Sequence, residues 1–593
     1  MRFLRIAAVL VATCFAAESS GAEPGVRIVL VGGKHQLQRN SDPYFIRGVG
    51  GNGPQPLLVS LGGNSVRTWG AEGLGETLDK AHALGLTVTA GIWLGQVRQG
   101  FDWSDAASLI KQRETVRAVI EKHRNHPALL MWSLGNEMED GEGKNGAVWS
   151  EINNLARLVK SIDAGHPTMT VIAELGGDKV KNLHALCPDI DVVGINSYAG
   201  GPSVAERYKK QGGSKPYVLT EFGPPGIWEI GKDEIDAYPE QTSTEKAAAY
   251  RNTYQQSVLG EPNLCLGSYA FLWGEKQEVT ATWFSILSGD SRLAAADTLS
   301  ELWTSKPVAN RCPVIESLTC VGSRQRKPGE TVLVTLKSSD PEQGELAVTW
   351  QFRFDAEQYG TGGDAEAAAL AINAAIVKKS NTAAEIKLPA DGGLYRLFAI
   401  VKDKQGGAAV ANIPLRVDAP RKTLVARQAE LPLVLYSEPE TAQTYIPAGW
   451  MGNAKAIKLD PENAEKPHAG KTCLRCDFTA KEGWGGVVWQ SPEQDWGDRP
   501  GGFDLTGAKR VKFWARGASG GEKVTFSFGL LEKPKPYFDT GKGSVETVLT
   551  ADWKEYEIPL DKLDLTRIKT GFVWTLASNG EPITFYLDDV RWE

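Results

Sequence analysis

Short apolar runs alternate with longer amphipathic stretches between about residue 43 and residue 303. Eight of these runs have the length and composition of buried strands: Tyr44 to Val49, Asn64 to Trp69, Thr87 to Trp93, Leu129 to Asn136, Thr168 to Leu175, Asp191 to Tyr198, Tyr217 to Phe222, and Leu266 to Trp273. Helical patterns fill the intervals, for example Ser104 to Lys122, Val148 to Ile162 and Thr244 to Leu259. Eight βα units in roughly 250 residues predict an α/β fold, a (β/α)8 TIM barrel, which we assign to residues 23–308.

After Trp303 the pattern changes to strands that follow one another without long helices. The pattern of short strands in residues 309–418 predicts an immunoglobulin-like β-sandwich. Within it, the alanine-rich stretch from Ala365 to Lys378 predicts a helical insertion. Residues 419–430 are polar and contain proline, as linkers do. Residues 431–593 again alternate as antiparallel strands, and a jelly roll is the expected architecture.

The N-terminus predicts a signal peptide over residues 1–22. Arg2 and Arg5 precede an apolar run from Ile6 to Ala17, and small residues follow it up to Ala22. We therefore expect a secreted or periplasmic protein that is soluble after cleavage. No later segment has the roughly 18 uninterrupted apolar residues of a membrane span.

Composition narrows the range of partners. The net charge of -7 and the lack of a basic run exclude the electrostatic footprint of a nucleic-acid-binding protein. The 18 tryptophans are the unusual feature, because flat apolar rings offer stacking surfaces for the C–H faces of sugars.

The cysteines predict one disulfide and no metal centre. Cys312 and Cys320 bracket a short loop that a disulfide would close in an oxidising compartment. Cys473 and Cys476 lie three positions apart in a strand-like run, so their side chains should point to opposite faces. A zinc site would need a second ligand pair at matching spacing, and the chain has none, so neither a metal nor another cofactor is expected.

Two glutamates terminate buried strands of the predicted barrel. Glu137 ends the run "ALLMWSLGNE" and Glu221 ends the run "YVLTE". The carboxyl ends of barrel strands meet at one rim, where catalytic groups from distant sequence positions assemble. Glycosidic bond cleavage needs two such carboxyl groups, one to protonate the leaving oxygen and one on the opposite face of the sugar. We therefore predict Glu137 and Glu221 as the catalytic pair.

The motifs around these glutamates resemble a known family. "WSLGNE" at residues 132–137 and "LTEFG" at residues 219–223 are similar to the acid/base and nucleophile motifs of glycoside hydrolase clan A barrels, closest to the family 2 type. The resemblance implies that Glu137 is the general acid/base and Glu221 the nucleophile of a retaining enzyme. Retention implies carboxyl groups about 5 to 5.5 Å apart.

The resemblance also implies the substrate-binding residues. Arg67 would hold the nucleophile carboxylate ionised, Asn136 would bind the sugar 2-OH, and Tyr198 would point its hydroxyl at Glu221. Trp273 would form the floor of the subsite before the scissile bond. Further tryptophans near strand ends are expected to line a cleft: Trp69, Trp93, Trp103, Trp228 and Trp283.

Four other acidic residues lie near the same loops. Glu174, at the end of the fifth strand, is a second-choice catalytic carboxylate. Glu139 and Glu142 are expected to be solvated, and Asp102 is a further acidic residue of this rim.

Residues 23–43 leave no room for the β-sandwich that precedes the barrel in family 2 exo-enzymes. A more open cleft and endo-acting cleavage of a neutral β-linked polysaccharide, such as a β-glucan, are therefore expected. Two alternatives stay open: a transglycosylase acting through the same intermediate, and a non-catalytic glycan-binding protein of the cell envelope.

The C-terminal domain is a candidate glycan-binding module. Its closing "FYLDDVRWE" resembles the last strand of jelly-roll carbohydrate-binding modules, and it carries many aromatic residues: Trp484, Trp489, Trp496, Trp514, Tyr537 and Trp574. A module of this kind would tether the barrel to a polymeric polysaccharide or oligosaccharide substrate and raise its local concentration.

Overall fold

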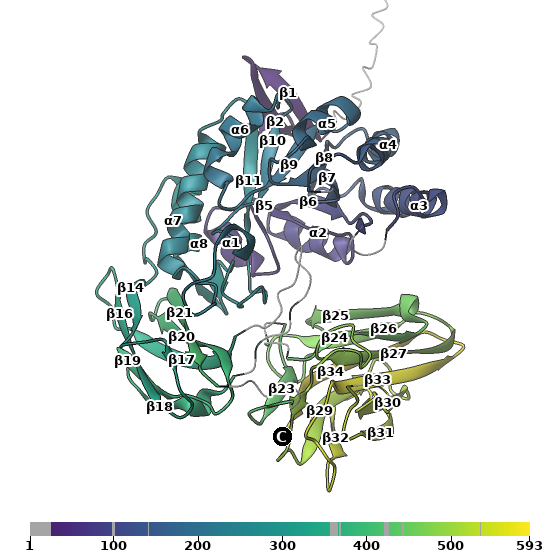
Figure 1. Cartoon of the computed structure of the whole chain (residues 1–593). Helices are drawn as coiled ribbons and strands as arrows, with labels where there is room; N and C mark the ends of the chain where they lie inside the picture. The colour runs from purple at the N-terminus through teal and green to yellow at the C-terminus, as the bar shows by residue number, and fades with distance from the viewer. Residues whose placement is uncertain are drawn as a thin grey trace, which may run out of the picture.

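A computed structural model describes residues 25–97, 101–139, 141–355, 366, 369, 371–419, 426–439, 441, 444–533, 535 and 537–593. The predicted signal peptide over residues 1–22 lies outside these residues, as do residues 420–425 of the predicted linker. The described chain forms a barrel followed by two all-β domains (Figure 1). In the part of the chain so described, no helix is both long and apolar enough to cross a bilayer.

The first domain is a closed barrel of eight strands, which confirms the predicted TIM barrel. Around the barrel the strands run in the order β10, β11, β4, β5, β6, β7, β8 and β9, and every neighbouring pair is parallel. Their bounds are β4 Ile46–Gly50, β5 Ser65–Arg67, β6 Thr87–Ile92, β7 Leu129–Asn136, β8 Thr168–Ala173, β9 Val192–Asn196, β10 Tyr217–Glu221 and β11 Cys265–Phe271. Each lies on one of the eight apolar runs of the sequence.

Helices surround the barrel, and α3, α4 and α7 begin at residues whose side chains cap them. The bounds are α1 Gln55–Ser60, α2 Leu74–Ala83, α3 Ala106–His123, α4 Gly146–Ile162, α5 Lys179–Leu186, α6 Val204–Lys210, α7 Ser243–Thr253 and α8 Ala294–Thr304. Asp105 caps α3 by accepting the Ser108 N–H, and Thr242 with Glu245 forms a capping box at α7. The buried faces of the helices pack on the outer face of the strands in one apolar cluster.

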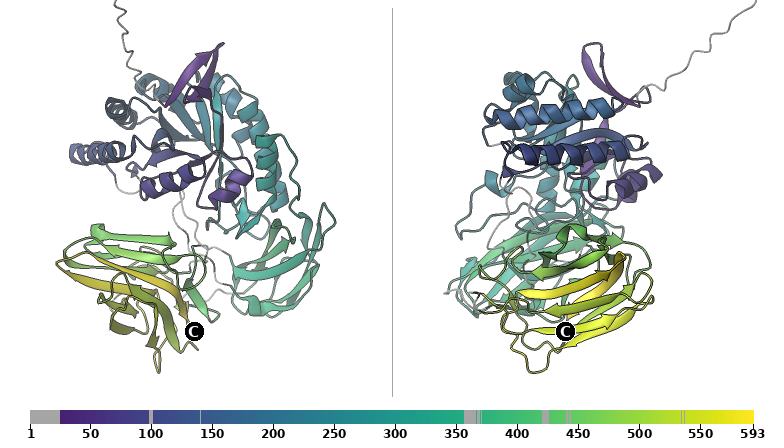
Figure 2. Two further views of the ribbon diagram at one scale, coloured as in Figure 1. Left: turned by 180° about the vertical axis from the view of Figure 1, so that it is seen from behind. Right: turned by 90° about the vertical axis from the view of Figure 1, so that its right-hand side faces the viewer.

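A hairpin closes the N-terminal end of the barrel. β1 (Val26–Val31) pairs with β2 (Lys34–Arg39), and the short β3 (Asp42–Pro43) extends the sheet. Val26 and Leu37 are buried against residues at the starts of the barrel strands. Figures 1 and 2 show the two all-β domains on the opposite side of the barrel from this hairpin. That side carries the C-terminal ends of the strands.

The second domain is a sandwich of two four-stranded sheets. One sheet has the order β14 (Val314–Cys320), β16 (Thr331–Ser339), β19 (Ala383–Lys387), β18 (Ile376–Lys379). The other has the order β15 (Gln325–Arg326), β21 (Ala408–Val417), β20 (Gly393–Lys402), β17 (Ala347–Phe354). Phe398, Ala408 and Val410 of the second sheet are buried with Leu293 of the barrel domain, so this sheet packs directly on the barrel.

The C-terminal domain is a larger sandwich. Its first sheet has the order β25 (Ile457–Asn463), β26 (Cys473–Phe478), β34 (Ile583–Trp592), β29 (Arg510–Gly517), β32 (Lys554–Pro559), with β23 (Leu433–Tyr436) paired to β34. The second has the order β24 (Ile446–Gly452), β27 (Glu482–Gln490), β33 (Thr570–Asn579), β30 (Lys523–Phe528), β31 (Gly543–Val548). A small sheet pairs β22 (Arg427–Gln428) with β28 (Phe503–Asp504). Both domains after the barrel are therefore all-β, which confirms the predicted fold class.

Two local predictions are wrong. Residues 365, 367, 368 and 370 of the expected helical insertion lie outside the described residues, but within its second half Asn373–Ala375 form one 3-10 turn and Ile376–Lys379 form strand β18. Pairing with β19, and the Asn373 side chain accepting the Phe352 N–H at 2.9 Å, override the helix propensity of the alanines.

The predicted disulfide is also absent. Cys312 and Cys320 are free, like the other cysteines of the described chain. The Cys312 thiol is buried and donates to the Arg292 carbonyl at 3.2 Å, whereas Cys320 ends β14 and its sulfur faces the Ser323 carbonyl at 3.6 Å. The loop between them is therefore a strand that carries the two sulfurs apart.

Candidate active site

The carboxyl ends of four barrel strands bring the predicted catalytic residues together. Arg67 is the last residue of β5, Asn136 of β7, Asn196 of β9 and Glu221 of β10, and Glu137 follows Asn136 directly. Hydrogen bonds join them across the barrel mouth, although they come from positions far apart in the sequence. The structure thus places both predicted catalytic glutamates in one polar network at the end of the barrel where TIM-barrel enzymes carry their chemistry.

Glu221 is buried among hydrogen-bond donors. Its Oε1 accepts bonds from Arg67 Nη1 at 2.9 Å and from Trp69 Nε1 at 2.8 Å, and its Oε2 accepts one from the Tyr198 hydroxyl at 2.8 Å. Only 7% of the residue is exposed. Three donors, one of them a buried guanidinium, fix the orientation of this carboxylate.

Tyr198 is held in its protonated form. Burial raises the pKa of its hydroxyl, and the charges of Glu221 and Glu278 raise that pKa further. The hydroxyl therefore stays a donor to Glu221 over the whole pH range of interest.

A tight turn after β7 presents Glu137. The pairing of β7 with β8 shifts register between Ser133 and Asn136, and Gly135 has φ 74°. Glu137 itself has φ 53°, a conformation that is uncommon for residues other than glycine. Its N–H donates to the Val171 carbonyl at 3.0 Å and holds the turn against β8. Such strain recurs at functional sites, where the surrounding structure fixes a side chain in a required direction.

The surroundings of Glu137 favour its protonated form. Burial raises the pKa of Glu137 to about 7, and the negative charge of Glu221 contributes in the same direction. A bond of 2.6 Å from Asn196 Nδ2 to Glu137 Oε1 opposes this shift without cancelling it. Near neutral pH one carboxyl group of the pair can therefore donate a proton while the other is surrounded by donors.

Asn136 connects the two halves of the site. Its Oδ1 accepts bonds from Arg67 Nη2 at 2.6 Å and from Asn196 Nδ2 at 3.2 Å, and its backbone carbonyl accepts one from Gln96 Nε2 at 2.7 Å. No described residue accepts a bond from Asn136 Nδ2. That donor is thus available to a sugar hydroxyl.

Aromatic side chains line one flank of the site. Phe271 lies edge-on to Trp69, with ring centroids 5.9 Å apart, and Tyr198 lies 5.1 Å from Phe284. Trp228 is 62% exposed and packs edge-on against Tyr198 at 5.6 Å. Trp93, 39% exposed, follows β6 at the same end of the barrel. These residues provide apolar surface beside the carboxyl groups.

Other predicted tryptophans do not lie at this surface. Trp103 and Trp283 are buried, and the Trp283 indole donates to the Pro225 carbonyl at 3.0 Å. Trp273, the expected floor of the subsite, is 1% exposed and packs in the apolar cluster that the helices form with the strands. The chain leaves β11 after Phe271, and the Trp273 backbone bonds Gly50 and Gly53. Side chains alternate between the two faces of a strand only as far as Phe271, where β11 ends, so this alternation does not turn Trp273 toward the site. Phe271 is the residue of this segment that packs against Trp69.

The remaining acidic residues have other partners. Glu174 pairs with Arg207 at 2.7 Å and accepts the Ser197 hydroxyl at 2.5 Å. Burial alone would raise the pKa of Glu174, but these bonds lower it, so this second-choice carboxylate is engaged elsewhere. Asp102 is exposed and bonds Ser104 in its own loop.

Glu139 contradicts the expectation of a solvated side chain. Only 2% of its side chain is exposed, and it pairs with Lys179 of α5 at 3.2 Å. Burial raises the pKa of Glu139, and Lys179 opposes that shift. Glu142, by contrast, is exposed as expected and lies 3.6 Å from Lys144.

Three site residues were missed from the sequence. Asn196 stands two positions before Tyr198 at the end of the sixth barrel strand, and its place at a strand end was the signal that could have identified it. Gln96 lies in the loop after β6. Glu278 lies in the loop after β11, where burial raises its pKa, Lys276 opposes the shift and the charge of Glu221 adds to it. Within the described residues there is no cluster of three or more side chains able to hold a metal ion.

Sequence comparison identifies the class of this barrel. Residues 81–258 match the family described as glycosyl hydrolases family 2, TIM barrel domain. This part of the barrel is therefore similar to a glycosidase domain of the family 2 type, in agreement with the resemblance carried by the two glutamate motifs. Carbohydrates are the substrates of such domains.

Particular relatives are β-glucuronidases. A β-glucuronidase of Paenibacillus borealis is 24% identical over 175 residues, which span 27% of this chain and 28% of the relative. The chain thus matches little more than a quarter of that protein's length. Among solved structures, Bacteroides uniformis β-glucuronidase 2 covalently bound to cyclophellitol-6-carboxylate aziridine has 14% identity and a TM-score of 0.37, covering 95% of this chain and 67% of that one. The β-D-glucuronidase of Dictyoglomus thermophilum has 19% identity and a TM-score of 0.37, covering 48% and 54%.

Proposed function

We propose that the protein is a retaining β-glycosidase that uses Glu137 as general acid/base and Glu221 as nucleophile. The observation that carries this proposal is the unequal environment of two carboxyl groups in one polar network. One group has a pKa of about 7, and the other accepts bonds from Arg67, Trp69 and Tyr198. Double displacement requires one carboxyl group of each kind.

In the first step Glu221 attacks the anomeric carbon, and Glu137 gives its proton to the departing glycosidic oxygen. The bond to the leaving group breaks as the bond to Glu221 forms, which leaves a glycosyl ester and an ionised Glu137. In the second step Glu137 removes a proton from water, which attacks the anomeric carbon and releases Glu221. Asn136 Nδ2 would bind the sugar 2-OH, a contact that strengthens as the transition state forms.

The charge of the site favours a neutral sugar at the point of cleavage. Glu278 places a further carboxyl group near Glu221, while Arg67 is occupied by Glu221 and Lys276 lies 3.5 Å from Glu278. A negatively charged sugar would meet repulsion there. The substrate we propose is a neutral β-linked polysaccharide or oligosaccharide, such as a β-glucan, cleaved at internal positions.

The P. borealis relative defines the competing substrate, because its name assigns it to β-glucuronides. Turnover of 4-nitrophenyl β-glucoside and β-glucuronide, measured side by side, separates the two possibilities. Reducing ends released from a β-glucan panel test endo-cleavage. Longer oligosaccharides formed at high acceptor concentration would indicate transglycosylation in place of hydrolysis. Export through the predicted signal peptide remains part of the proposal and is tested by N-terminal sequencing of the mature protein.

Product stereochemistry tests the reaction directly. Proton NMR of the first-formed product should show the β-anomer before mutarotation, and Glu221→Gln should abolish turnover. Appearance of the α-anomer first, or substantial activity of the Gln variant, would refute the proposed roles.

A further inference from the structure

One loop separates the candidate active site from the immunoglobulin-like domain. We define the β11–β12 loop as residues 272–286, between β11 and β12 (Leu287–Ser288). On one side, Phe284 of this loop lies 5.1 Å from the ring of Tyr198, whose hydroxyl bonds the proposed nucleophile. On the other side, Lys276 and Thr280 line a cavity of about 600 Å³ together with Arg353 of β17. The loop thus has one side toward each domain.

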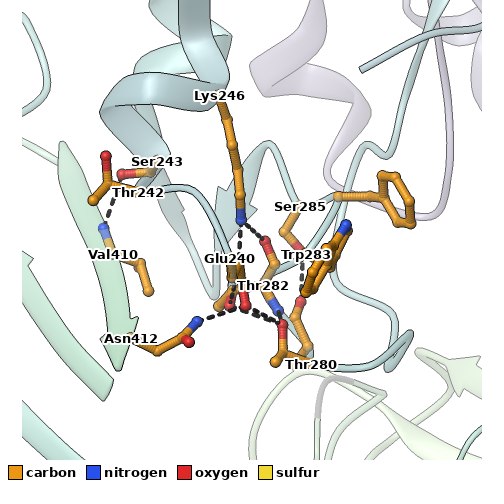
Figure 3. A network of polar contacts seen from close by, with 12 residues as sticks. Glu240, Thr242, Ser243, Lys246, Thr280, Thr282, Trp283, Ser285, Val410 and Asn412 are labelled. Atoms are coloured by element: carbon orange, nitrogen blue, oxygen red, sulfur yellow. Dashed lines mark hydrogen bonds and ion pairs between the residues drawn. The ribbon is translucent and has the colours of Figure 1, made fainter. Parts of the chain in front are cut away.

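Glu240 binds this loop through the side chains of Thr280 and Thr282. Its side chain is 1% exposed and accepts four side-chain bonds (Figure 3). Lys246 Nζ and Thr282 Oγ1 donate to Oε1 at 2.5 and 2.8 Å. Thr280 Oγ1 and Asn412 Nδ2 donate to Oε2 at 2.7 and 2.5 Å. The four donors come from α7, from two positions of the β11–β12 loop and from β21 of the immunoglobulin-like domain.

Electrostatics keep Glu240 in its ionised form. Burial alone would raise the pKa of Glu240, but the positive charges of Lys246 and Arg396 and the bonds it accepts lower that pKa below its ordinary value. Lys246 is itself buried and also donates to the Thr282 carbonyl at 2.7 Å. A buried anion that loses one of its donors is strongly destabilised, so the arrangement resists any movement of the loop away from Glu240.

The immunoglobulin-like domain fixes the other end of the network. Asn412 Oδ1 accepts a bond from Arg396 Nη1 at 2.8 Å, which turns the Asn412 amide nitrogen toward Glu240. Arg396 is 1% exposed and pairs with Asp355 at 2.7 Å. Its Nη2 reaches back to the Tyr238 carbonyl of the barrel domain at 2.6 Å. Asn412 is therefore positioned by its own domain before it contacts the barrel.

The hydrogen bonds to Glu240 also constrain a residue close to the catalytic pair, Glu278. Thr280 and Glu278 exchange two backbone bonds, of 2.8 and 3.1 Å, so holding Thr280 also holds Glu278. Between them Val279 has φ 66°, and its N–H donates to Glu366 of the immunoglobulin-like domain at 2.7 Å. A strained loop conformation of this kind persists only where its surroundings fix it.

Resting on the proposed glycosidase function, we propose that Glu240 is a positioning residue that makes the immunoglobulin-like domain part of the active site. Docking of Asn412 on Glu240 completes the set of donors that fixes Thr280 and Thr282. The fixed loop then holds Phe284 against Tyr198 and Glu278 near Glu221. The accessory domain thereby sets the geometry of the reaction without contacting the substrate.

The test compares four variants of the full chain. Thr280→Val removes one donor to Glu240 at nearly constant shape, Thr280→Ser keeps that donor, and Asn412→Ala removes the donor of the immunoglobulin-like domain. Arg324→Gln is the matched control. Arg324 pairs with Asp233 at 2.8 Å and with Glu234 across the same domain boundary, without contacting the β11–β12 loop. Kinetics on an aryl β-glycoside and deuterium uptake of peptides within residues 272–286 are measured for each.

We expect Thr280→Val and Asn412→Ala to lower kcat about tenfold or more, with KM changed less than threefold, and to raise deuterium uptake in the loop. Thr280→Ser should restore both quantities, and Arg324→Gln should leave kcat within twofold of the wild type. Equal losses in Arg324→Gln and Asn412→Ala would overturn the inference, because they would indicate a general effect of domain docking. Unchanged kcat and uptake in both donor variants would overturn it as well.

The experiment still discriminates if one variant does not fold or if the wild type is inactive on the aryl glycoside. If Thr280→Val fails to fold, Asn412→Ala carries the same comparison, since Asn412 is only partly buried. If the wild type cleaves no aryl glycoside, the proposed function fails. Deuterium uptake then still shows whether Glu240 and Asn412 fix the loop.

Discussion

Glu137 and Glu221 are the same residue type in two different environments. Glu221 accepts bonds from a guanidinium, an indole and a phenol, whereas Glu137 accepts one amide bond and lies in the field of its partner. Desolvation raises the pKa of a carboxyl group, and hydrogen bonds to its charged form lower it. The proposed division of roles between acid and nucleophile therefore follows from the immediate neighbours of each side chain.

Replacement of Glu137 by Gln tests its role as the acid. Wild-type kcat/KM should fall as pH rises through about 7, since the required proton is lost above that pKa. Glu137→Gln should lower kcat/KM about 10²- to 10⁴-fold for substrates with poor leaving groups and abolish this alkaline limb. Substrates with a 2,4-dinitrophenyl leaving group, which need no proton, should lose far less. Equal losses for both kinds of substrate would contradict the assignment.

The same variant should change stability in a pH-dependent way. The pKa of Glu137 is raised by folding, so the protonated side chain is the form that the folded state prefers. Its contribution is fully present below the unfolded pKa of about 4.3 and is lost as pH rises through about 7. Glu137→Gln should therefore gain stability relative to the wild type between these pH values. Urea unfolding at pH 4.5 and pH 8 measures the difference, and a pH-independent difference would be inconsistent with the raised pKa.

Replacement of Arg67 should lower the stability of the protein by a predictable amount. Arg67→Met leaves Glu221 buried without its cation, and breaking a buried pair in this way costs about 3–5 kcal/mol. Arg157→Met breaks a pair with Asp189 whose side chains are 64% and 31% exposed, and it should cost less than about 1 kcal/mol. Denaturant unfolding of the two variants checks the contrast. Similar losses would indicate that the Arg67 pair is not a buried interaction.

At the scale of single elements, the turn after β7 positions Glu137, the proposed acid. A Cβ on Gly135 would lie 2.0 Å from Met138 Sδ, at φ 74°. Gly85, between α2 and β6, has φ 72° with no atom within 4 Å of a built Cβ. Both Gly→Ala substitutions carry the backbone strain of about 1–2 kcal/mol, but only Gly135→Ala displaces its neighbours.

Gly135→Ala should therefore lower kcat by about tenfold or more, because it shifts Asn136 and Glu137. Gly85→Ala should lose a similar amount of stability and keep its kcat. Thermal unfolding and kinetics of the two variants give the comparison. Loss of activity in Gly85→Ala would show that backbone strain alone accounts for the effect.

The barrel elements and the positions of the candidate catalytic pair were predictable from the sequence because both depend on local patterns. Buried parallel strands are apolar runs, and Glu137 and Glu221 each end one of them. Trp273 was misplaced because side-chain alternation holds only while the chain remains in β11, which ends at Phe271. The burial of Glu139 depends on Lys179 in α5, a tertiary contact without a sequence pattern. The hydrogen bond from Asn412 to Glu240 joins two domains and likewise has no sequence pattern that would predict it.

At the scale of the whole molecule, both all-β domains lie on the catalytic side of the barrel (Figure 2). The C-terminal domain exposes Trp450 on β24 and Trp484 on the neighbouring β27, at 43% and 50%. Exposed indoles on paired strands are suited to stacking on sugar rings. Trp489 and Trp574, predicted with them, are buried in the sandwich and contribute to its core.

Replacement of both exposed indoles tests a tethering role. The double variant Trp450→Ala, Trp484→Ala should lose about tenfold or more in affinity for insoluble polysaccharide while keeping its kcat on a soluble aryl glycoside. Val548→Ala, at an exposed aliphatic position of the same sheet (56%), is the control and should bind normally. A pull-down with the polymer measures binding, and unchanged retention of the double variant would assign the domain a purely structural role.

The proposed mechanism requires a covalent bond between Glu221 and the sugar. Mass spectrometry of the intact chain and of its peptides, after exposure to 2-deoxy-2-fluoro β-glycosides with an activated leaving group, measures this bond. We expect one glycosyl adduct per chain, located on the peptide that contains Glu221 and absent from Glu221→Gln. An adduct on another residue, or continued turnover of the fluorinated reagent without any adduct, would contradict the account.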